Sequence, residues 1–304
     1  MKHRDKHAAT GASAPGGKRR RRRLPRWADR LITMAVILVG VGLMVWPWVL
    51  DRFEAAGVFN QIDAVSSTVD ALPPQERERI LLQARAYNEL LAGENPELPA
   101  EQVAPYEEQL IFDRDPMMSW VEIPSINVSM PIYHGTGEEA LMAGVGHLEG
   151  TSLPVGGTSS HCVLTAHSGM RNLSMFDDIH ALVEGDLVLL HTMNQTLAYR
   201  VTGSEVVWPD EVESLAIEPG ADKLTLVTCT PYGVNDHRLL VHCNRTEYVE
   251  QEVAEQKSLL ARHWGKREIA ALVVVAAAVL ILLDIVIHRL RQRCGDGRRV
   301  RPLG

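Results

Sequence analysis

Two long apolar runs constrain this chain more than any other feature of its sequence. Residues 31–50 and residues 269–287 each come close to the roughly 20 apolar residues that a helix needs to cross a bilayer, and Asp284 alone interrupts the second run. The segment between them, residues 51–268, is long enough for a sizeable core. We therefore expect two transmembrane helices flanking one folded segment.

The charges around these runs predict how they are oriented. Lys and Arg outnumber Asp and Glu by 11 to 2 in residues 1–50 and by 6 to 2 in residues 269–304, whereas residues 51–268 carry 14 basic and 34 acidic residues. Basic flanks of a membrane span favour the cytoplasmic side. We expect a two-pass cell-membrane protein whose basic tails, 1–30 and 288–304, are cytoplasmic and whose acidic middle is extracellular.

The basic run Lys18–Arg23 leaves two alternatives open. It could bind nucleic acid, but an apolar run follows it closely and the acidic middle would repel phosphates at long range. It could begin a cleaved signal peptide, but the apolar run is long for one and Val45–Trp48 offers no small-residue cleavage site. We prefer a retained anchor in the lipid bilayer, with no nucleic-acid partner.

The first regular pattern in the middle segment is the spacing of apolar residues that is typical of a helix. Residues 74–91 predict a helix with one apolar face and a stop at Gly93. The residues on that face are Ile80, Ala84, Tyr87 and Leu91. Residues 94–116, rich in Pro and Glu, predict a long irregular connection. Further helices are expected at 137–144 and 249–267.

From Ser119 onwards, short apolar runs alternate with turn residues, which is typical of an all-β barrel or sandwich. The expected strands are 119–123, 126–132, 162–166, 186–192, 196–208, 223–229 and 238–244. The middle of the chain is therefore predicted to be mainly β.

Three residues at predicted strand ends could carry chemistry together. Cys229 ends one strand before a Thr-Pro turn, Arg238 begins the next strand, and His167 ends an earlier one. A thiol is only partly ionised at neutral pH, and a nearby cation favours the reactive thiolate. A His can give a proton to a leaving amine, and a guanidinium can stabilise an oxyanion. These roles suit one catalytic rim.

The segment Thr225-Leu226-Val227-Thr228-Cys229 matches the Thr-Leu-x-Thr-Cys signature of sortases residue for residue. Arg238 and His167 occupy the positions of that family's arginine and histidine. Further segments are similar to class C sortases, the pilin-polymerising group, over a region of about 119–245. They are Tyr133–Thr136, Gly144–Gly157 and Cys229–Gly233.

This resemblance implies an eight-stranded sortase β-barrel with an N-terminal helical segment and two flanking transmembrane helices. The parts expected on this basis are a cytoplasmic tail 1–30, a transmembrane helix 31–50, a helical segment with a lid 51–116, the barrel 117–247, a juxtamembrane segment 248–268, a transmembrane helix 269–287 and a tail 288–304.

The resemblance also implies a cysteine transpeptidase that needs no cofactor. Cys229 would attack the Thr–Gly bond of an LPxTG-like sorting signal, His167 would protonate the departing amine, and Arg238 would stabilise the oxyanion. The acyl group would pass to a lysine amine of another pilin subunit. Two alternatives stay open: a sortase that anchors surface proteins to cell-wall peptide, and a membrane-tethered module that binds without catalysis.

One departure concerns the lid, which class C sortases usually anchor with an Asp-Pro-aromatic triplet. Here Ala104-Pro105-Tyr106 lacks the Asp, and Asp115-Pro116 is followed by Met117. We expect Pro105 and Tyr106 to form a lid over Cys229, with an ordinary Pro-rich linker as the alternative. Thr228 is expected to contact substrate or lid.

The other cysteines and histidines are expected to be structural. Cys162 and Cys243 fall in β-rich runs and suit core positions, with a disulfide between them left open, while Cys294 falls in the C-terminal tail. No metal is expected, because the Cys and His residues lack paired metal-ligand spacing. The residues weighed for zinc are His161, Cys162, His167, Cys229, His237, His242 and Cys243.

Overall fold

The computed structural model describes residues 61–97, 99–111, 116–168, 175–231 and 233–258, with a few positions between 35 and 46. The chain divides into two units, Met1–Ala55 and Ala56–Gly304, and every element discussed below belongs to the second. Apart from those few positions, the predicted tails and the apolar runs 31–50 and 269–287 lie outside the described residues. Among the helices that the structure does describe, none is long and apolar enough to span a membrane.

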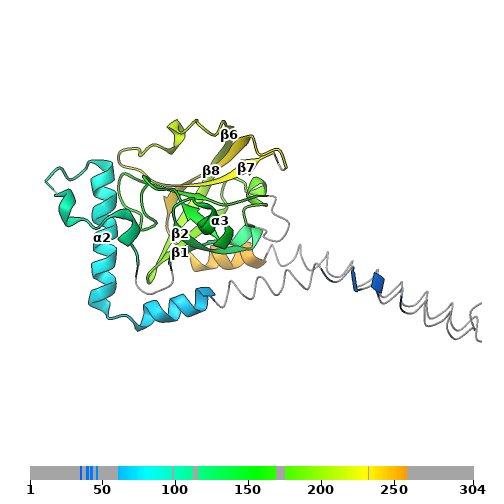
Figure 1. The fold of residues 1–304 in the computed structure, drawn as a ribbon, viewed down its shortest axis with the longest axis horizontal. Coiled ribbons are helices and arrows are strands. Elements are labelled where there is room, and N and C mark those ends of the chain that lie inside the picture. The colour runs from blue at the N-terminus through cyan, green and yellow to red at the C-terminus, as the bar shows by residue number, and fades with distance from the viewer. Residues whose placement is uncertain are drawn as a thin grey trace, which may run out of the picture. The chain divides into compact units, whose positions relative to one another are not determined.

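Eight strands within the described residues close into a β-barrel, as predicted (Figure 1). They are β1 Met117–Ile123, β2 Val128–His134, β3 Val145–His147, β4 Ser160–Thr165, β5 Leu187–Thr192, β6 Gln195–Val207, β7 Asp222–Thr230 and β8 His237–Thr246. The order around the barrel is β1-β2-β3-β4-β7-β8-β6-β5. Because β4 and β7 are parallel and β8 is antiparallel to β7, the ends of β4 and β7 meet the start of β8 at one rim.

Successive side chains of β7 point alternately into the barrel and towards its outer face, as in any β-strand. Leu224 and Leu226 are fully buried in the main core. Val227 instead packs with Val163 of β4 and Leu240 of β8 in a separate cluster. This outer cluster lies on the same side of β7 as Cys229, two residues further along the strand.

All seven predicted strands are confirmed, with ends that differ by up to two residues from those expected. The sequence analysis missed β3, because three residues give no measurable periodicity. β3 matters to the topology, since it pairs in parallel with β2 and antiparallel with β4. The short helix α3, Glu138–Ala143, confirms the helix predicted at 137–144, and residues 250–258 are the described part of the helix predicted at 249–267.

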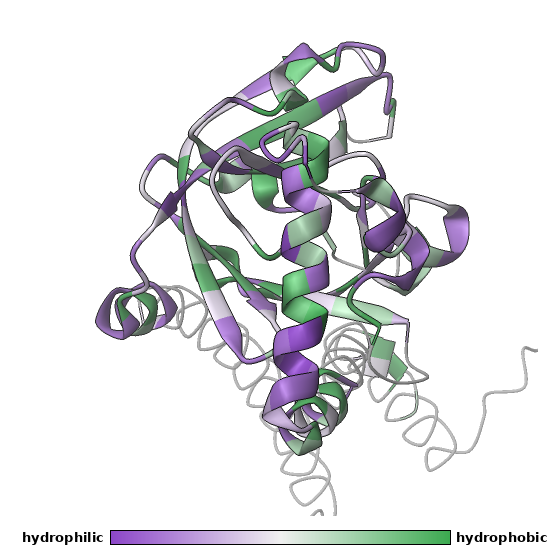
Figure 2. Ribbon diagram, turned by 90° about the vertical axis from the view of Figure 1, so that its left-hand side faces the viewer, coloured by the Kyte–Doolittle hydropathy of each residue, from purple (hydrophilic) through white to green (hydrophobic). Residues whose placement is uncertain are grey.

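Helix α2, Pro74–Ala92, confirms the helix predicted at 74–91. Proline suits its first turn because the first amide of a helix has no partner within the helix. Gly93 ends it with a φ of 67°, in the left-handed region that glycine adopts without strain. Figure 2 shows α2 running across one side of the barrel, with hydrophobic and hydrophilic residues alternating along it.

The buried face of α2 differs from the predicted one at its C-terminal end. Ile80 and Ala84 are buried as expected, but Leu91 is 37% exposed and the polar Asn88 is buried in its place. The Asn88 side chain accepts a hydrogen bond from the Leu153 amide at 2.7 Å and donates to the Leu153 carbonyl at 3.2 Å. The Asn88 side-chain amide can be buried here because the loop before β4 provides its hydrogen-bond partners.

Candidate active site

The predicted catalytic residues lie in one row across three neighbouring strands. Cys229 of β7 pairs directly with Arg238 of β8. Thr165, the last residue of β4, pairs with Val227, and the Ala166 amide donates to the Val227 carbonyl at 3.1 Å. This parallel register, continued by two residues, brings His167 level with Cys229. Neighbouring strands are about 4.8 Å apart, so all three backbones lie within reach of one substrate bond.

Cys229 is a free, partly exposed thiol whose backbone is held firmly. The Ser168 hydroxyl donates to the Cys229 carbonyl at 2.7 Å. On the other side of the strand, the Thr228 hydroxyl donates to the Ala166 carbonyl at 2.8 Å. Two hydroxyls therefore tie the end of β4 to the end of β7, and this fixes the spacing between His167 and Cys229.

Arg238 is half-buried at the start of β8. Its Nη1 donates to the carbonyls of Asn235 and His237, at 3.2 Å and 2.9 Å. These bonds use one end of the guanidinium, which offers five N–H donors in a planar fork. A guanidinium fixed in this way can donate to an oxyanion without the cost of ordering a free side chain.

A hydrophobic floor lies next to the row. Val163, Val227 and Leu240 form it, and three partly buried residues pack against it, namely Leu148, Val207 and Leu215. Trp208, which is 53% exposed, packs its ring on His237 with 4.1 Å between ring centroids. Apolar side chains beside a nucleophile suit the binding of an extended peptide.

Thr228 does not lie where the sequence analysis placed it. The prediction made it a substrate or lid residue, but its side chain is only 4% exposed and binds the Ala166 carbonyl inside the wall. Successive strand residues point to opposite faces, so Thr228 is turned away from the face that carries Cys229. Its role in the structure is to position the strands.

Tyr106 is buried in the barrel wall beside β2 and β3. Its hydroxyl lies 3.0 Å from Nδ1 of His147 and accepts a hydrogen bond from the Gly135 amide at 2.9 Å. Its ring also stacks on His147. These contacts anchor the connection after α2 at β2 and β3, and the lid of Pro105 and Tyr106 over Cys229 stays a prediction.

Cys162 and Cys243 are buried free thiols, so the disulfide left open by the sequence does not form. Both residues pair with Leu224, one from each side of β7. Two strand spacings, about 9.6 Å, exceed the distance that a disulfide can bridge. Burial also raises the pKa of both thiols, which keeps them protonated and unreactive.

Three of the four histidines weighed as zinc ligands have other partners. His161 and His242 take part in a hydrogen-bond chain on the outer face, and His237 binds Asp236 at 2.7 Å. Across the described residues, no group of three or more His, Cys, Asp or Glu side chains is arranged to hold a metal ion.

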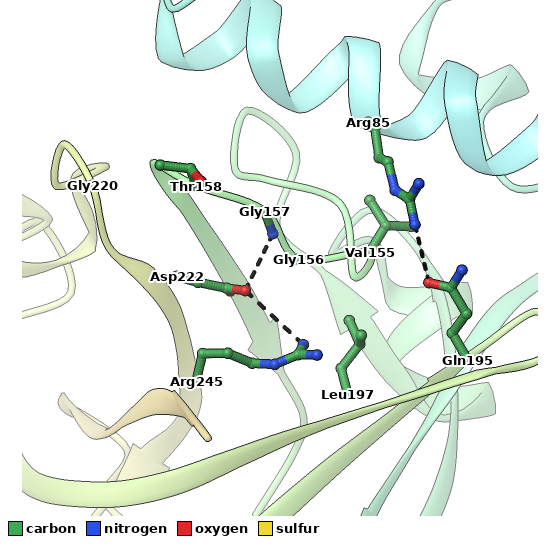
Figure 3. A pocket seen from close by; sticks show the side chains of 10 residues that line it. All are labelled: Arg85, Val155, Gly156, Gly157, Thr158, Gln195, Leu197, Gly220, Asp222 and Arg245. Carbon is green, nitrogen blue, oxygen red and sulfur yellow. Dashed lines mark hydrogen bonds and ion pairs between the residues drawn. The ribbon is translucent and has the colours of Figure 1, made fainter. Parts of the chain in front are cut away.

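A polar pocket of about 410 Å³ lies at the far end of β7 from Cys229 (Figure 3). Asp222, the first residue of β7, accepts from the Gly157 amide at 3.2 Å and pairs with Arg245 at 4.0 Å. Arg85 of α2 donates to Gln195 at 3.3 Å. These side chains already have partners within the protein. Seven residues of strand, or about 23 Å, separate this pocket from Cys229.

Sequence reasoning missed Ser168 as a positioning residue. The sequence shows that Ser168 directly follows His167. Its hydrogen bond to the Cys229 carbonyl could not be predicted, because that bond depends on the parallel pairing of β4 with β7. It also missed the partners of His161 and His242, which come from two other strands, β6 and β7, and from the β6–β7 connection, residues 208–221.

Comparisons with known proteins agree with this geometry. The Sortase domain family matches residues 121–246. The structure of the lid mutant of Streptococcus agalactiae sortase C1 is 43% identical, with a TM-score of 0.57, and the match covers 62% of this chain and 99% of that chain. A Clostridium perfringens sortase C structure, with the C-terminal cell wall sorting motif, is 39% identical, with a TM-score of 0.56 over 62% of this chain and 100% of that chain.

Curated relatives match over a shorter region. Sortase A of Streptococcus agalactiae is 28% identical over 149 residues, which is 48% of this chain. The match spans about 60% of that relative's own length.

Proposed function

This chain belongs to the class C group of the sortase family, and on that premise we propose that it is a cysteine transpeptidase that joins pilin subunits. Its substrate is an LPxTG-like sorting signal, which it cleaves between Thr and Gly. The observation that carries the proposal is the row formed by His167, Cys229 and Arg238 across β4, β7 and β8. A free thiol, an imidazole and a guanidinium on one exposed edge are the groups that acyl transfer needs.

In the first step, the Cys229 thiolate attacks the carbonyl carbon of the signal's threonine. The negative charge that develops on the carbonyl oxygen is stabilised by N–H groups of Arg238. The C–N bond then breaks, and the departing glycine amine takes a proton from His167. The products are a thioester on Cys229 and the released C-terminal peptide.

In the second step, a lysine amine of another pilin subunit attacks the thioester. His167, now neutral, accepts the proton that the amine loses, and the C–S bond breaks to regenerate Cys229. The new isopeptide bond links two subunits, so repeated cycles build a covalent pilus.

We also propose that the enzyme is held at the cell membrane by residues 31–50 and 269–287, with the barrel outside and both tails in the cytoplasm. The support is the length of the apolar runs and the basic residues that flank them. Such anchoring would keep the barrel close to pilin subunits as they leave the membrane.

Mass spectrometry of the purified chain, incubated with an LPxTG peptide and a pilin carrying an acceptor lysine, tests the proposal. We expect a thioacyl adduct on Cys229, followed by an isopeptide bond to the lysine. The matched control is Cys243→Ala, which removes a buried thiol and should keep the adduct, whereas Cys229→Ala should lose it. Resolution only by short wall-type amines would indicate an anchoring sortase, and no adduct at all would leave a binding module.

A further inference from the structure

A chain of hydrogen bonds crosses the outer face of the barrel below the catalytic row. Nε2 of His161 on β4 lies 2.7 Å from the Thr225 hydroxyl on β7, which lies 3.0 Å from Nδ1 of His242 on β8. Nε2 of His242 lies 3.1 Å from Oε1 of Glu205 on β6. The chain thus joins four adjacent strands of the barrel.

Both ends of this chain hold the β6–β7 connection. Nδ1 of His161 lies 3.0 Å from the Ala216 carbonyl, and the Ser214 side chain hydrogen-bonds to Glu205. Leu215, between these two contacts, packs on the floor that includes Val227. The connection is therefore held at Ser214 and at Ala216, on either side of Leu215. Leu215 packs on the sheet beside Val227, which precedes Cys229 by two residues.

The four hydrogen bonds from Ala216 to Glu205 need four protons. The Ala216 carbonyl and an ionised Glu205 can only accept, so every proton must come from the three groups between them. Two neutral imidazoles and one hydroxyl supply three protons. The chain is complete only when one further proton is bound.

That proton belongs on His242. Its Nε2 faces the Glu205 carboxylate, whereas Nδ1 of His161 faces an uncharged carbonyl. Burial lowers the pKa of His161, and the hydrogen bonds from Ser214 and His242 lower the pKa of Glu205. The other charged groups near the chain are Lys223 of β7 and Glu218 of the connection, which pair with each other.

We infer that His242 is a positioning residue that, when protonated, clamps the β6–β7 connection beside the sorting-signal site. This inference rests on the proposed function and deepens it. When His242 is neutral, the three remaining protons satisfy the contacts from Glu205 to His161, so that an Nδ1 lone pair of His161 faces the Ala216 carbonyl and the connection loosens. The KM for the sorting peptide rises while kcat changes little.

Two variants separate this inference from a general structural role. In Glu205→Gln, the amide N–H of the new side chain supplies the fourth proton to neutral His242, so the chain is complete without an added proton. In His242→Phe, the ring shape is retained but the chain is broken. The matched control is His191→Gln, which removes a different His–Glu pair, with Glu122, on the β1–β5 side of the barrel.

The KM and kcat of each protein for an uncharged LPxTG peptide are measured under the same conditions. We expect the KM of His242→Phe to be about three- to tenfold above that of the wild type, as for the loss of one ordinary hydrogen bond, with kcat little changed. Glu205→Gln should keep the low KM, and His191→Gln should follow the wild type. A Glu205→Gln protein that behaves like His242→Phe, or a His242→Phe protein with the wild-type KM, would overturn the inference.

Hydrogen–deuterium exchange of residues 213–216 gives a readout that does not depend on catalysis. Protection should be high in the wild type and in Glu205→Gln and low in His242→Phe. Equal protection in all three proteins would refute the clamp even if Cys229 forms no adduct. Failure of the clamp and failure of the proposed function are thus seen in different measurements.

Discussion

Cys229 and Arg238 are directly paired residues on antiparallel strands, so their side chains emerge on the same face of the barrel. The pairing places the proposed nucleophile and the guanidinium on two rigid strands, whereas His167 follows the end of a third. Ser168 and Thr228 secure that third strand with hydrogen bonds to the backbone. The spacing of the three proposed catalytic residues is thus set by backbone register, and the following predictions test it.

Arg238→Ala should slow acylation of Cys229 by about 10²- to 10³-fold, the usual cost of removing one oxyanion donor. The measurement is the rate constant of adduct formation with a sorting peptide. Arg245→Ala, at the other end of β8, is the control and should acylate at the wild-type rate. A similar loss in both variants would assign the effect to β8 stability instead.

Thr228→Val should lower the free energy of unfolding by about 1–3 kcal/mol, because it leaves the buried Ala166 carbonyl without its donor. Acylation should slow as well, since the end of β4 loses its tie to β7. Urea denaturation and adduct kinetics measure the two effects. Thr228→Ser keeps the hydroxyl and should restore most of both; if it fails to do so, side-chain packing rather than the hydrogen bond is responsible.

Tyr106→Phe should lower the melting temperature without exposing the thiol. The change removes the hydroxyl that binds His147 and Gly135, at a cost of about 1–3 kcal/mol. The rate of Cys229 alkylation by iodoacetamide should stay at the wild-type value under native conditions. Faster alkylation would support the predicted lid instead.

Acid should weaken the fold through His147, because burial lowers its pKa to about 4. Above about pH 6.5, the imidazole is neutral in both the folded and the unfolded state and pH has no effect through this residue. Between pH 6.5 and 4, the unfolded state binds a proton that the folded state does not. The free energy of unfolding should therefore fall by about 3 kcal/mol over this range and level off below it.

Urea denaturation at pH 7, 5.5 and 4 measures this loss. His147→Gln removes the titrating group, so its stability should fall less over the same range, even if its stability at pH 7 is lower. Parallel losses in the wild type and the variant would show that other groups govern acid unfolding.

Among the barrel cysteines, Cys229 alone should react with iodoacetamide in the native protein. Cys162 and Cys243 are buried, and their pKa values are raised by that burial. The experiment uses the Cys294→Ser chain, so that the tail cysteine does not contribute. Peptide mapping after labelling should find modified Cys162 and Cys243 only once urea is added; native labelling of either would contradict the burial described here.

The sequence alone determined the features that depend on neighbouring residues. The spacing of apolar residues identified α2 and seven of the eight strands, and the signature around Cys229, with His167 and Arg238, identified the chemistry. These features are local, because strand and helix periodicity and short motifs are written within a few consecutive residues.

The tertiary structure decided what depends on which strands become neighbours. Asn88 could be buried only because a distant loop satisfies its amide, and β3 was recognisable only from its partners. The inward direction of Thr228, the buried place of Tyr106 and the separation of Cys162 from Cys243 follow from strand order and register. The His242 chain likewise exists only because four strands meet on one face. Contacts between residues far apart in the sequence arise from closure of the barrel, which no local pattern encodes.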